Sequence, residues 1–170
     1  HHLVKRPIGQ LIQPSPPLNA LRAVRPDTRF VFDHGYDVAN AAARAARADA
    51  AIVFATRWAS EGFDSGDLVL PGGQDRLISA VAKANRNGIV VLETGNPVLM
   101  PWLDEVQAVV EAWYPGQKGG EAIADVLSGA VNPSGRLPMS FPRSERQNPR
   151  PELPGLGAQD ETLAVDYSEG

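Results

Sequence analysis

The stretch AAIVFATRWASEGFDSGDLVLPGGQDRLISAVAKANRNGIVVLE (residues 50–93) decides the fold of this 170-residue chain. It opens on an apolar run at 50–55 and ends on another at 89–93, and strands that are buried on both faces read in this continuous way. Residues 74–86, between the two runs, carry apolar side chains at helical spacing. The order strand, helix, strand predicts an α/β domain with a mainly parallel sheet flanked by helices, an α/β sandwich.

Further elements are predicted on both sides of this unit. Short runs rich in apolar and β-branched residues predict strands at 29–32 and 108–113. Other helices are indicated by helical spacing of apolar residues, by Asp37 and Asn96 as N-caps, and by Gly129 as a C-terminal stop. These helices are expected at residues 17–24, 37–48, 97–103 and 121–128.

The two ends of the chain differ in character from its middle. We interpret residues 1–14 as a partial N-terminal segment or the remnant of a purification tag, because the chain starts with two histidines. The sandwich domain is assigned to residues 15–142. Prolines recur from Pro133 onward and interrupt any regular element, so an extended, Pro-rich C-terminal tail is predicted. Residues 143–170 of this tail are expected to lead into further sequence.

Composition excludes several classes of function. The chain has 16 Lys+Arg against 20 Asp+Glu, a formal net charge of −4, and no run of basic residues that would favour nucleic-acid binding. No apolar run approaches the roughly 18 residues of a membrane span. The absence of cysteine excludes disulfides and thiol nucleophiles. His34 is the one histidine beyond the first two residues, which argues against a histidine-based metal site or a Ser-His-Asp triad.

The long connection at residues 57–73 is the most informative segment for function. Connections of this kind usually span about 2–6 residues, and sites in open α/β sheets gather at the carboxyl ends of strands. Residues 58–67 read WASEGFDSGD, with three carboxylates and two aromatic side chains. A carboxylic acid beside aromatic surface is suited to general acid catalysis. The alternative is a solvated acidic loop with Asx-turns at Asp64 and Asp67.

Three other features have competing interpretations. The glycine-rich segment 116–120 follows a strand and opens a helix, as phosphate-binding loops do, but it matches neither common phosphate-loop pattern. A tight turn is therefore favoured there. Trp113 and Tyr114 just before it could stack on a sugar, although aromatics at strand ends more often serve packing. His34 lies in the segment 33–36, which is typical of a turn.

Four stretches resemble the C-terminal α/β sandwich domain of glycoside hydrolase family 3, the β-glucosidase family. Their order and spacing extend over more than half of the chain. They are WASEGFD (58–64) with DL (67–68) and LP (70–71), VVLETGNPV (90–98), AWYPGQ (112–117) with GGEAIADVL (119–127), and NPSGRLP (132–138) with SFP (140–142).

The resemblance implies a retaining glycosidase with its two carboxylates on two domains. The acid/base residue of the family matches Glu61, whereas the nucleophilic Asp belongs to an N-terminal (β/α)₈ barrel that these residues do not include. Trp58, Phe63 and Asp64 are implied to bind substrate or order the loop. Ser65 stands where the family usually has Arg, which bears on loop order. We therefore expect a piece of a larger β-glucosidase that is inactive alone.

The resemblance implies no organic cofactor and no metal. The implied partners are the barrel domain of the same enzyme and a β-glucoside substrate, and a periplasmic or secreted location is slightly favoured. Two alternatives stay open. One is another activity of the same family, β-xylosidase or β-N-acetylglucosaminidase. The other is a non-catalytic α/β binding module.

Overall fold

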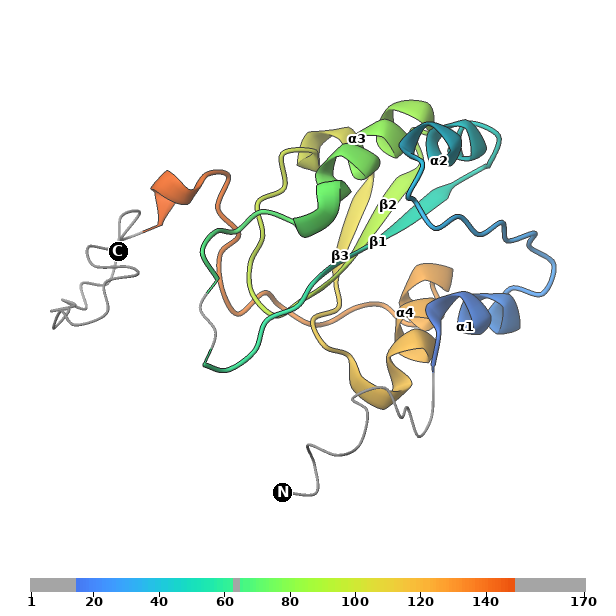
Figure 1. Cartoon of the computed structure of the whole chain (residues 1–170). Coiled ribbons are helices and arrows are strands. Elements are labelled where there is room, and N and C mark those ends of the chain that lie inside the picture. The colour runs from blue at the N-terminus through green and yellow to red at the C-terminus, as the bar shows by residue number, and fades with distance from the viewer. Residues whose placement is uncertain (1–14, 63–64, 149–170) are drawn as a thin grey trace, which may run out of the picture.

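The computed structural model describes residues 15–62 and 65–148. Its centre is a three-stranded parallel sheet in the order β1-β2-β3 (Figure 1). β1 (Ala51–Arg57) pairs with β2 (Gly88–Thr94), which pairs in turn with β3 (Ala108–Glu111). These are three of the four predicted strands, and their parallel pairing confirms the predicted sheet.

Helices lie on both sides of the sheet. α2 (Val38–Ala45) and α3 (Gln74–Ala84) pack together over one face, while α1 (Pro17–Val24) and α4 (Gly119–Ser128) pair on the other side (Figure 1). The four helices confirm predictions at these places, and the α/β sandwich is confirmed with them. Asp37 caps α2 as expected. Four short 3₁₀ turns complete the elements: η2 (Pro71–Gly73), η3 (Leu103–Glu105), η4 (Gly116–Lys118) and η5 (Glu145–Gln147).

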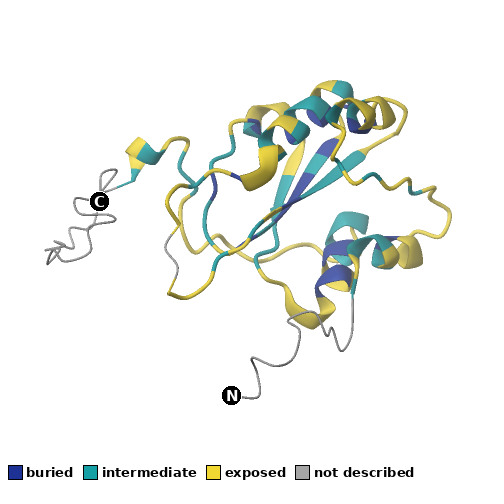
Figure 2. Cartoon of the chain, viewed as in Figure 1, coloured by how far each residue is buried: buried dark blue, intermediate teal, exposed yellow. Residues whose placement is uncertain are grey.

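The main core lies between the sheet and α3, where buried residues appear dark blue in Figure 2. Trp102 is fully buried in it, and its indole Nε1 donates a hydrogen bond of 2.7 Å to Asp75 Oδ1. A buried indole N–H needs such a partner, so α3 and the segment after β2 are fixed to each other. The buried members of this core are Ala55, Leu70, Ile78, Val90, Leu92, Val98 and Trp102.

The predicted strand at 29–32 is wrong. These residues have no regular structure, and Val31 and Phe32 are 57% and 56% exposed. Strand propensity reflects a fit to a pleated, partly buried surface, and a strand exists only where its backbone groups are paired. The sheet formed by the described residues includes only β1, β2 and β3, so this segment has no pairing partner there.

The predicted helix at 97–103 is also wrong. Residues 97–100 have no regular structure, and η3 is the nearest helical turn. Here tertiary contacts outweigh the Asn-Pro signal: the Leu99 N–H donates to the Leu68 carbonyl at 2.8 Å, and Val98 is fully buried in the main core. In a regular helix the Leu99 N–H would lie in the first turn, whereas here it bonds to a distant carbonyl.

The described part of the C-terminal tail, through residue 148, contains η5 but otherwise no helix or strand after α4. It follows the surface of the domain and contributes Phe141 to the edge of the main core. Residues 149–170 lie outside the described residues, as do residues 1–14. Among the helices of the described ranges, none is long and apolar enough to cross a membrane.

Candidate active site

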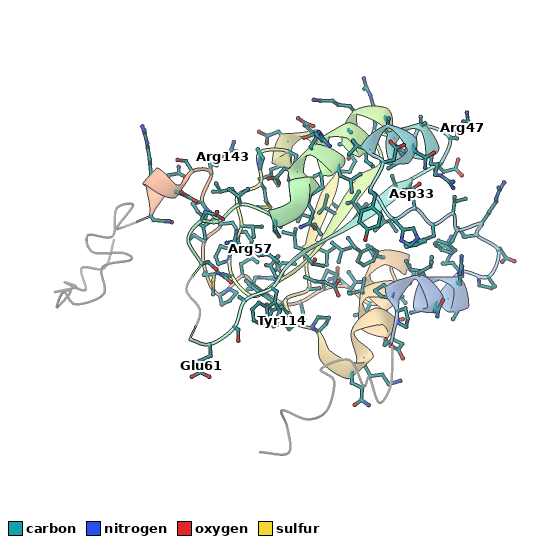
Figure 3. The ribbon with its side chains drawn as sticks, viewed as in Figure 1. Asp33, Arg47, Arg57, Glu61, Tyr114 and Arg143 are labelled. Carbon is teal, nitrogen blue, oxygen red and sulfur yellow. The ribbon has the colours of Figure 1, made fainter. Side chains whose placement is uncertain are left out.

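The long connection leaves the carboxyl end of β1, as predicted, and reaches α3 through η2. Glu61 lies in a turn within it, is exposed, and points away from the body of the domain in Figure 3. Trp58, at the start of the connection, is 75% exposed. Phe63 and Asp64, the other two predicted site residues, lie outside the described residues.

The segment before Glu61 is held by a tyrosine from the end of β3. The Ala59 N–H donates to Tyr114 Oη at 2.5 Å, and Tyr114 Oη lies 3.1 Å from the Ala59 carbonyl oxygen, close enough to donate to it. The approach requires a glycine at position 95. A Cβ there would lie 2.6 Å from the Ala59 Cβ and 2.7 Å from Tyr114 Oη. The small residues at 59 and 95 therefore allow the tyrosine to fix this backbone.

The segment after Glu61 is held by Arg57. Its Nη1 donates to Asp67 Oδ1 at 2.9 Å and also to the Val69 carbonyl, and its Nη2 donates to the Asp67 carbonyl. The arginine side chain is only 11% exposed, so this ion pair is more than a loose surface contact. One guanidinium thus ties the end of β1 to residues 67–69.

Further hydrogen bonds fix the half of the connection after Glu61 and join the two elements that flank the connection. Asn96 Nδ2 donates to Ser65 Oγ at 3.2 Å, and the Leu68 N–H donates to Glu145 Oε1 at 2.9 Å. Gln74 Oε1 accepts from the Thr56 N–H, and its Nε2 donates to the Thr56 carbonyl, both at 2.8 Å. The connection is therefore anchored at both ends, with Glu61 between the anchors.

Asp67, another carboxylate of the connection, is engaged in hydrogen bonds within the loop. Its Oδ1 accepts from the Val69 N–H at 3.0 Å, so the Asx-turn that the alternative interpretation placed at Asp67 is present. Hydrogen bonds from the Val69 N–H and from Arg57 hold the pKa of Asp67 below its ordinary value. An acid kept ionised in this way is a poor proton donor, so Asp67 is better suited to loop structure than to general acid catalysis.

The direction of the Tyr114 side chain depends on an unusual backbone conformation at the residue before it. Trp113 has a φ of 52°, which bulky residues rarely adopt. The Trp113 N–H donates to Glu111 Oε1 at 2.8 Å, and Thr94 Oγ1 lies 3.3 Å from Glu111 Oε2. Burial raises the pKa of Glu111, whereas these hydrogen bonds oppose the rise. The Trp113 ring packs 6.0 Å from that of Phe141, which agrees with the packing interpretation.

An open hollow of about 390 Å³ lies beside the connection. It brings the exposed Trp58 ring next to the ion pair of Arg57 with Asp67, so an aromatic face adjoins polar groups there. Such a surface suits a polar ligand with one apolar face. The lining residues are Arg57, Trp58, Asp67, Val69, Leu70 and Pro71.

The other candidates have structural roles. Residues 116–118 form η4, which continues directly into α4, so the turn interpretation is confirmed. His34 lies just before a bend at residues 35–37, and the Gly35 N–H donates to Asp33 Oδ1 at 2.8 Å around it, which agrees with the expected turn. Within residues 15–62 and 65–148, no three histidine, aspartate or glutamate side chains are grouped to hold a metal ion.

Comparison with known proteins identifies the family. The model of the glycosyl hydrolase family 3 C-terminal domain matches residues 8–170, and the chain belongs to this family. It is 50% identical over 149 residues to beta-glucosidase B of Emericella nidulans, an alignment that covers 81% of this chain and 18% of that enzyme.

Solved structures agree with this assignment. The β-glucosidase DesR of Streptomyces venezuelae, crystallised with D-glucose, is 56% identical with a TM-score of 0.62, over 64% of this chain and 14% of DesR. A family 3 β-glucosidase of Neurospora crassa is 34% identical with a TM-score of 0.73, over 79% of this chain and 18% of that one. The chain therefore spans less than a fifth of these relatives.

Two residues important for the geometry of the site were missed at the sequence level. Arg57 was not singled out, although an arginine at a strand end, ten residues before an aspartate, is a signal in hindsight. Tyr114 was considered only for stacking or packing, and its hydroxyl has a third role that no local pattern indicates. Its partner Ala59 lies 55 residues away in sequence.

Proposed function

We propose that this chain is the acid/base-bearing domain of a retaining β-glucosidase that hydrolyses β-linked glucosides. Glu61 gives its proton to the departing oxygen in the first step and takes one from water in the second. In such a mechanism the same residue acts as acid and then as base. No metal or organic cofactor takes part in this proposal.

The main observation that supports this proposal is the position of Glu61. Its carboxyl group is exposed on a connection that is anchored on both sides, by Tyr114 before it and by Arg57 after it. An acid/base catalyst needs access to substrate and a positioned backbone, and the exposed carboxyl group between two anchors supports this role for Glu61. Family membership and the β-glucosidases among the relatives support the reaction class.

The second carboxylate of the mechanism is proposed to come from another domain. Retaining glycosidases need two carboxyl groups about 5–5.5 Å apart. Because the relatives are far longer than this chain, we assign the nucleophile to an N-terminal (β/α)₈ barrel domain of the same enzyme. The cleft between the two domains would then hold the glucoside, with Trp58, Phe63 and Asp64 as residues that bind it or order the connection.

The alternatives differ in the sugar or in the presence of chemistry. A β-xylosidase or β-N-acetylglucosaminidase would use Glu61 in the same way, since the sugar pocket would be built mainly by the barrel. A binding module would show no turnover at all. Turnover of aryl β-glucosides, β-xylosides and β-N-acetylglucosaminides by the full-length enzyme separates these possibilities.

Replacement of Glu61 tests its role. In the full-length enzyme, Glu61→Ala is expected to lower turnover of an alkyl glucoside by roughly 10²–10⁴-fold, because a poor leaving group needs a proton to depart. A dinitrophenyl glucoside leaves without protonation, so its first step should survive. Azide needs no base and should restore turnover, giving a β-glucosyl azide through two inversions.

Asp64→Ala is the matched control, because it removes a nearby carboxylate that has a loop-ordering role in this proposal. It should show no azide rescue. Equal losses by Glu61→Ala on both substrates, without an azide product, would mean that Glu61 is not the acid/base residue.

A further inference from the structure

We propose that Tyr114 is a positioning residue for acid/base catalysis: its hydroxyl fixes the backbone at Ala59 and thereby the orientation of Glu61. This inference rests on the proposed function of Glu61. Tyr114 contributes no group to the reaction itself. It acts through the two peptide bonds that link Ala59 to Glu61 by way of Ser60.

The hydrogen bonds of Tyr114 are concentrated on one short segment. Its oxygen accepts from the Ala59 N–H at 2.5 Å and lies 3.1 Å from the Ala59 carbonyl and 3.4 Å from the Arg57 carbonyl. Both polar groups of the Ala59 backbone are thus within reach of a single hydroxyl. Because only Ser60 separates Ala59 from Glu61, fixing the Ala59 backbone limits where the Cα of Glu61 can lie.

Contacts of the preceding residue, Trp113, hold Tyr114 in place. The φ of 52° at Trp113 is unfavourable for an aromatic residue, and backbone strain of this kind persists only where surrounding contacts impose it. Glu111 supplies such a contact, since its carboxylate accepts from the Trp113 N–H at 2.8 Å. The Trp113 ring also packs against the ring of Phe141. The turn that these contacts stabilise directs Tyr114 toward β1.

The same side chain is half exposed, with 54% of its surface accessible, so burial is a weak explanation for a tyrosine at this position. A phenylalanine would keep the ring and lose only the hydroxyl. The difference between the two residues is therefore the hydrogen bonding to the backbone at Arg57 and Ala59, and Tyr114→Phe removes that interaction alone.

The test uses Tyr114→Phe in the full-length enzyme with two substrates. If Glu61 is displaced, proton transfer suffers first, so kcat for an alkyl glucoside should fall by roughly 10–10²-fold, the loss that a shift of about 1 Å can cause. For a dinitrophenyl glucoside, kcat/KM should change less than about threefold, because its leaving group needs no proton. Azide should partly restore turnover of the dinitrophenyl substrate.

Tyr36→Phe is the matched control. It removes the same atom from a tyrosine that is 93% exposed and whose hydroxyl has no hydrogen bond within the described ranges. This variant should behave as the parent enzyme with both substrates. Equal losses by Tyr114→Phe on both substrates, or a rise in KM for both, would overturn the positioning role, because they indicate unfolding or direct substrate contact.

A second measurement uses the 170-residue chain and needs no catalysis. Hydrogen exchange at the Ala59 amide should become about tenfold faster or more in Tyr114→Phe, whereas the amide of Val91 in the buried sheet should be unchanged. Unchanged exchange at Ala59 would overturn the inference. If Glu61→Ala shows equal losses on both substrates and no azide product, the proposed function is wrong. If Glu61→Ala behaves as expected but Tyr114→Phe behaves as the parent enzyme, only the positioning role of Tyr114 is wrong.

Discussion

Glu61 has a carboxyl group that is open to solvent and a backbone that is anchored on both sides. This combination suits a residue that must meet a substrate presented by another surface. Exclusion of water around the reacting bond would then come from that surface when the cleft closes. In the proposed mechanism, this domain holds the Glu61 backbone and the barrel encloses the reacting bond.

Ser65 occupies the position where the resemblance leads one to expect an arginine, and other contacts hold residues 65–69 there. Ser65 Oγ accepts from Asn96, and Arg57 provides a guanidinium from the end of β1. Arg57 reaches residues 67–69 with two nitrogen atoms. An arginine is thus present beside the connection, but it comes from a different place in the sequence.

Glu121 gives a pH prediction. Hydrogen bonds from Ser15 and then Lys118 lower its pKa from 4.5 to about 2. A carboxylate whose pKa is lowered by folding stabilises the protein above the unfolded-state value, and this stabilisation is lost as the pH falls through the folded-state value. The contribution of Glu121 should therefore be complete above about pH 4.5 and disappear toward pH 2.

Thermal unfolding of the chain between pH 2 and pH 7 measures this effect. Glu121→Gln should unfold at lower temperature than the parent at neutral pH, and the two should converge toward pH 2. Ser15→Ala removes the larger cause of the shift and should reduce the same dependence. Parallel curves for Glu121→Gln and the parent over this range would contradict the assignment.

At the level of elements, the pairing of α1 with α4 depends on a glycine. Gly120 lies in the first turn of α4, and its N–H donates to Ser15 Oγ at 2.9 Å. A Cβ on Gly120 would collide with the backbone of Ser15, just before α1. The glycine therefore allows the two helices to approach each other closely, at the cost of some helix propensity.

Gly120→Ala should destabilise the domain by about 1–3 kcal/mol, because backbone atoms must move to admit the methyl group. In an exposed helix the same change would stabilise by about 0.5–1 kcal/mol, so the sign of the effect is diagnostic. Gly135→Ala is the control, since a Cβ there meets nothing within 4 Å. Urea unfolding of the three proteins measures the difference, and a stabilised Gly120→Ala variant would disprove the close approach.

At the scale of the whole molecule, the chain corresponds to only a small fraction of the length of the family enzymes. The chain spans 14–18% of the three relatives compared above. Among the described residues, Asp67 is the carboxylate that lines the hollow beside the connection, and it is engaged by Arg57. A retaining mechanism needs a second, free carboxylate close to the first.

The 170-residue chain alone should therefore show no β-glucosidase activity toward an aryl glucoside. The measurement is release of the aryl alcohol by the purified chain, with the full-length enzyme as the positive control. Turnover that co-purifies with the chain and disappears in Glu61→Ala would overturn the two-domain mechanism.

Local signals in the sequence determined most elements of this protein. Helical spacing predicted α3, Asp37 marked the start of α2, and Gly129 ends α4 in the left-handed conformation. The length of the connection after β1 also indicated a functional segment. Each of these features depends on residues within a few positions of one another, so a single sequence contains the information. The role of Glu61 came from motif resemblance and stays a prediction.

Tertiary structure alone decided the features that depend on distant partners. Residues 29–32 have strand propensity but no neighbouring strand in the described sheet, and residues 97–100 follow their contact with Leu68 rather than the Asn-Pro signal. The hydroxyl of Tyr114 meets Ala59 only because parallel pairing brings the ends of β1, β2 and β3 to one edge. Backbone groups bond to whatever the fold places beside them, and no periodicity in the sequence records that partner.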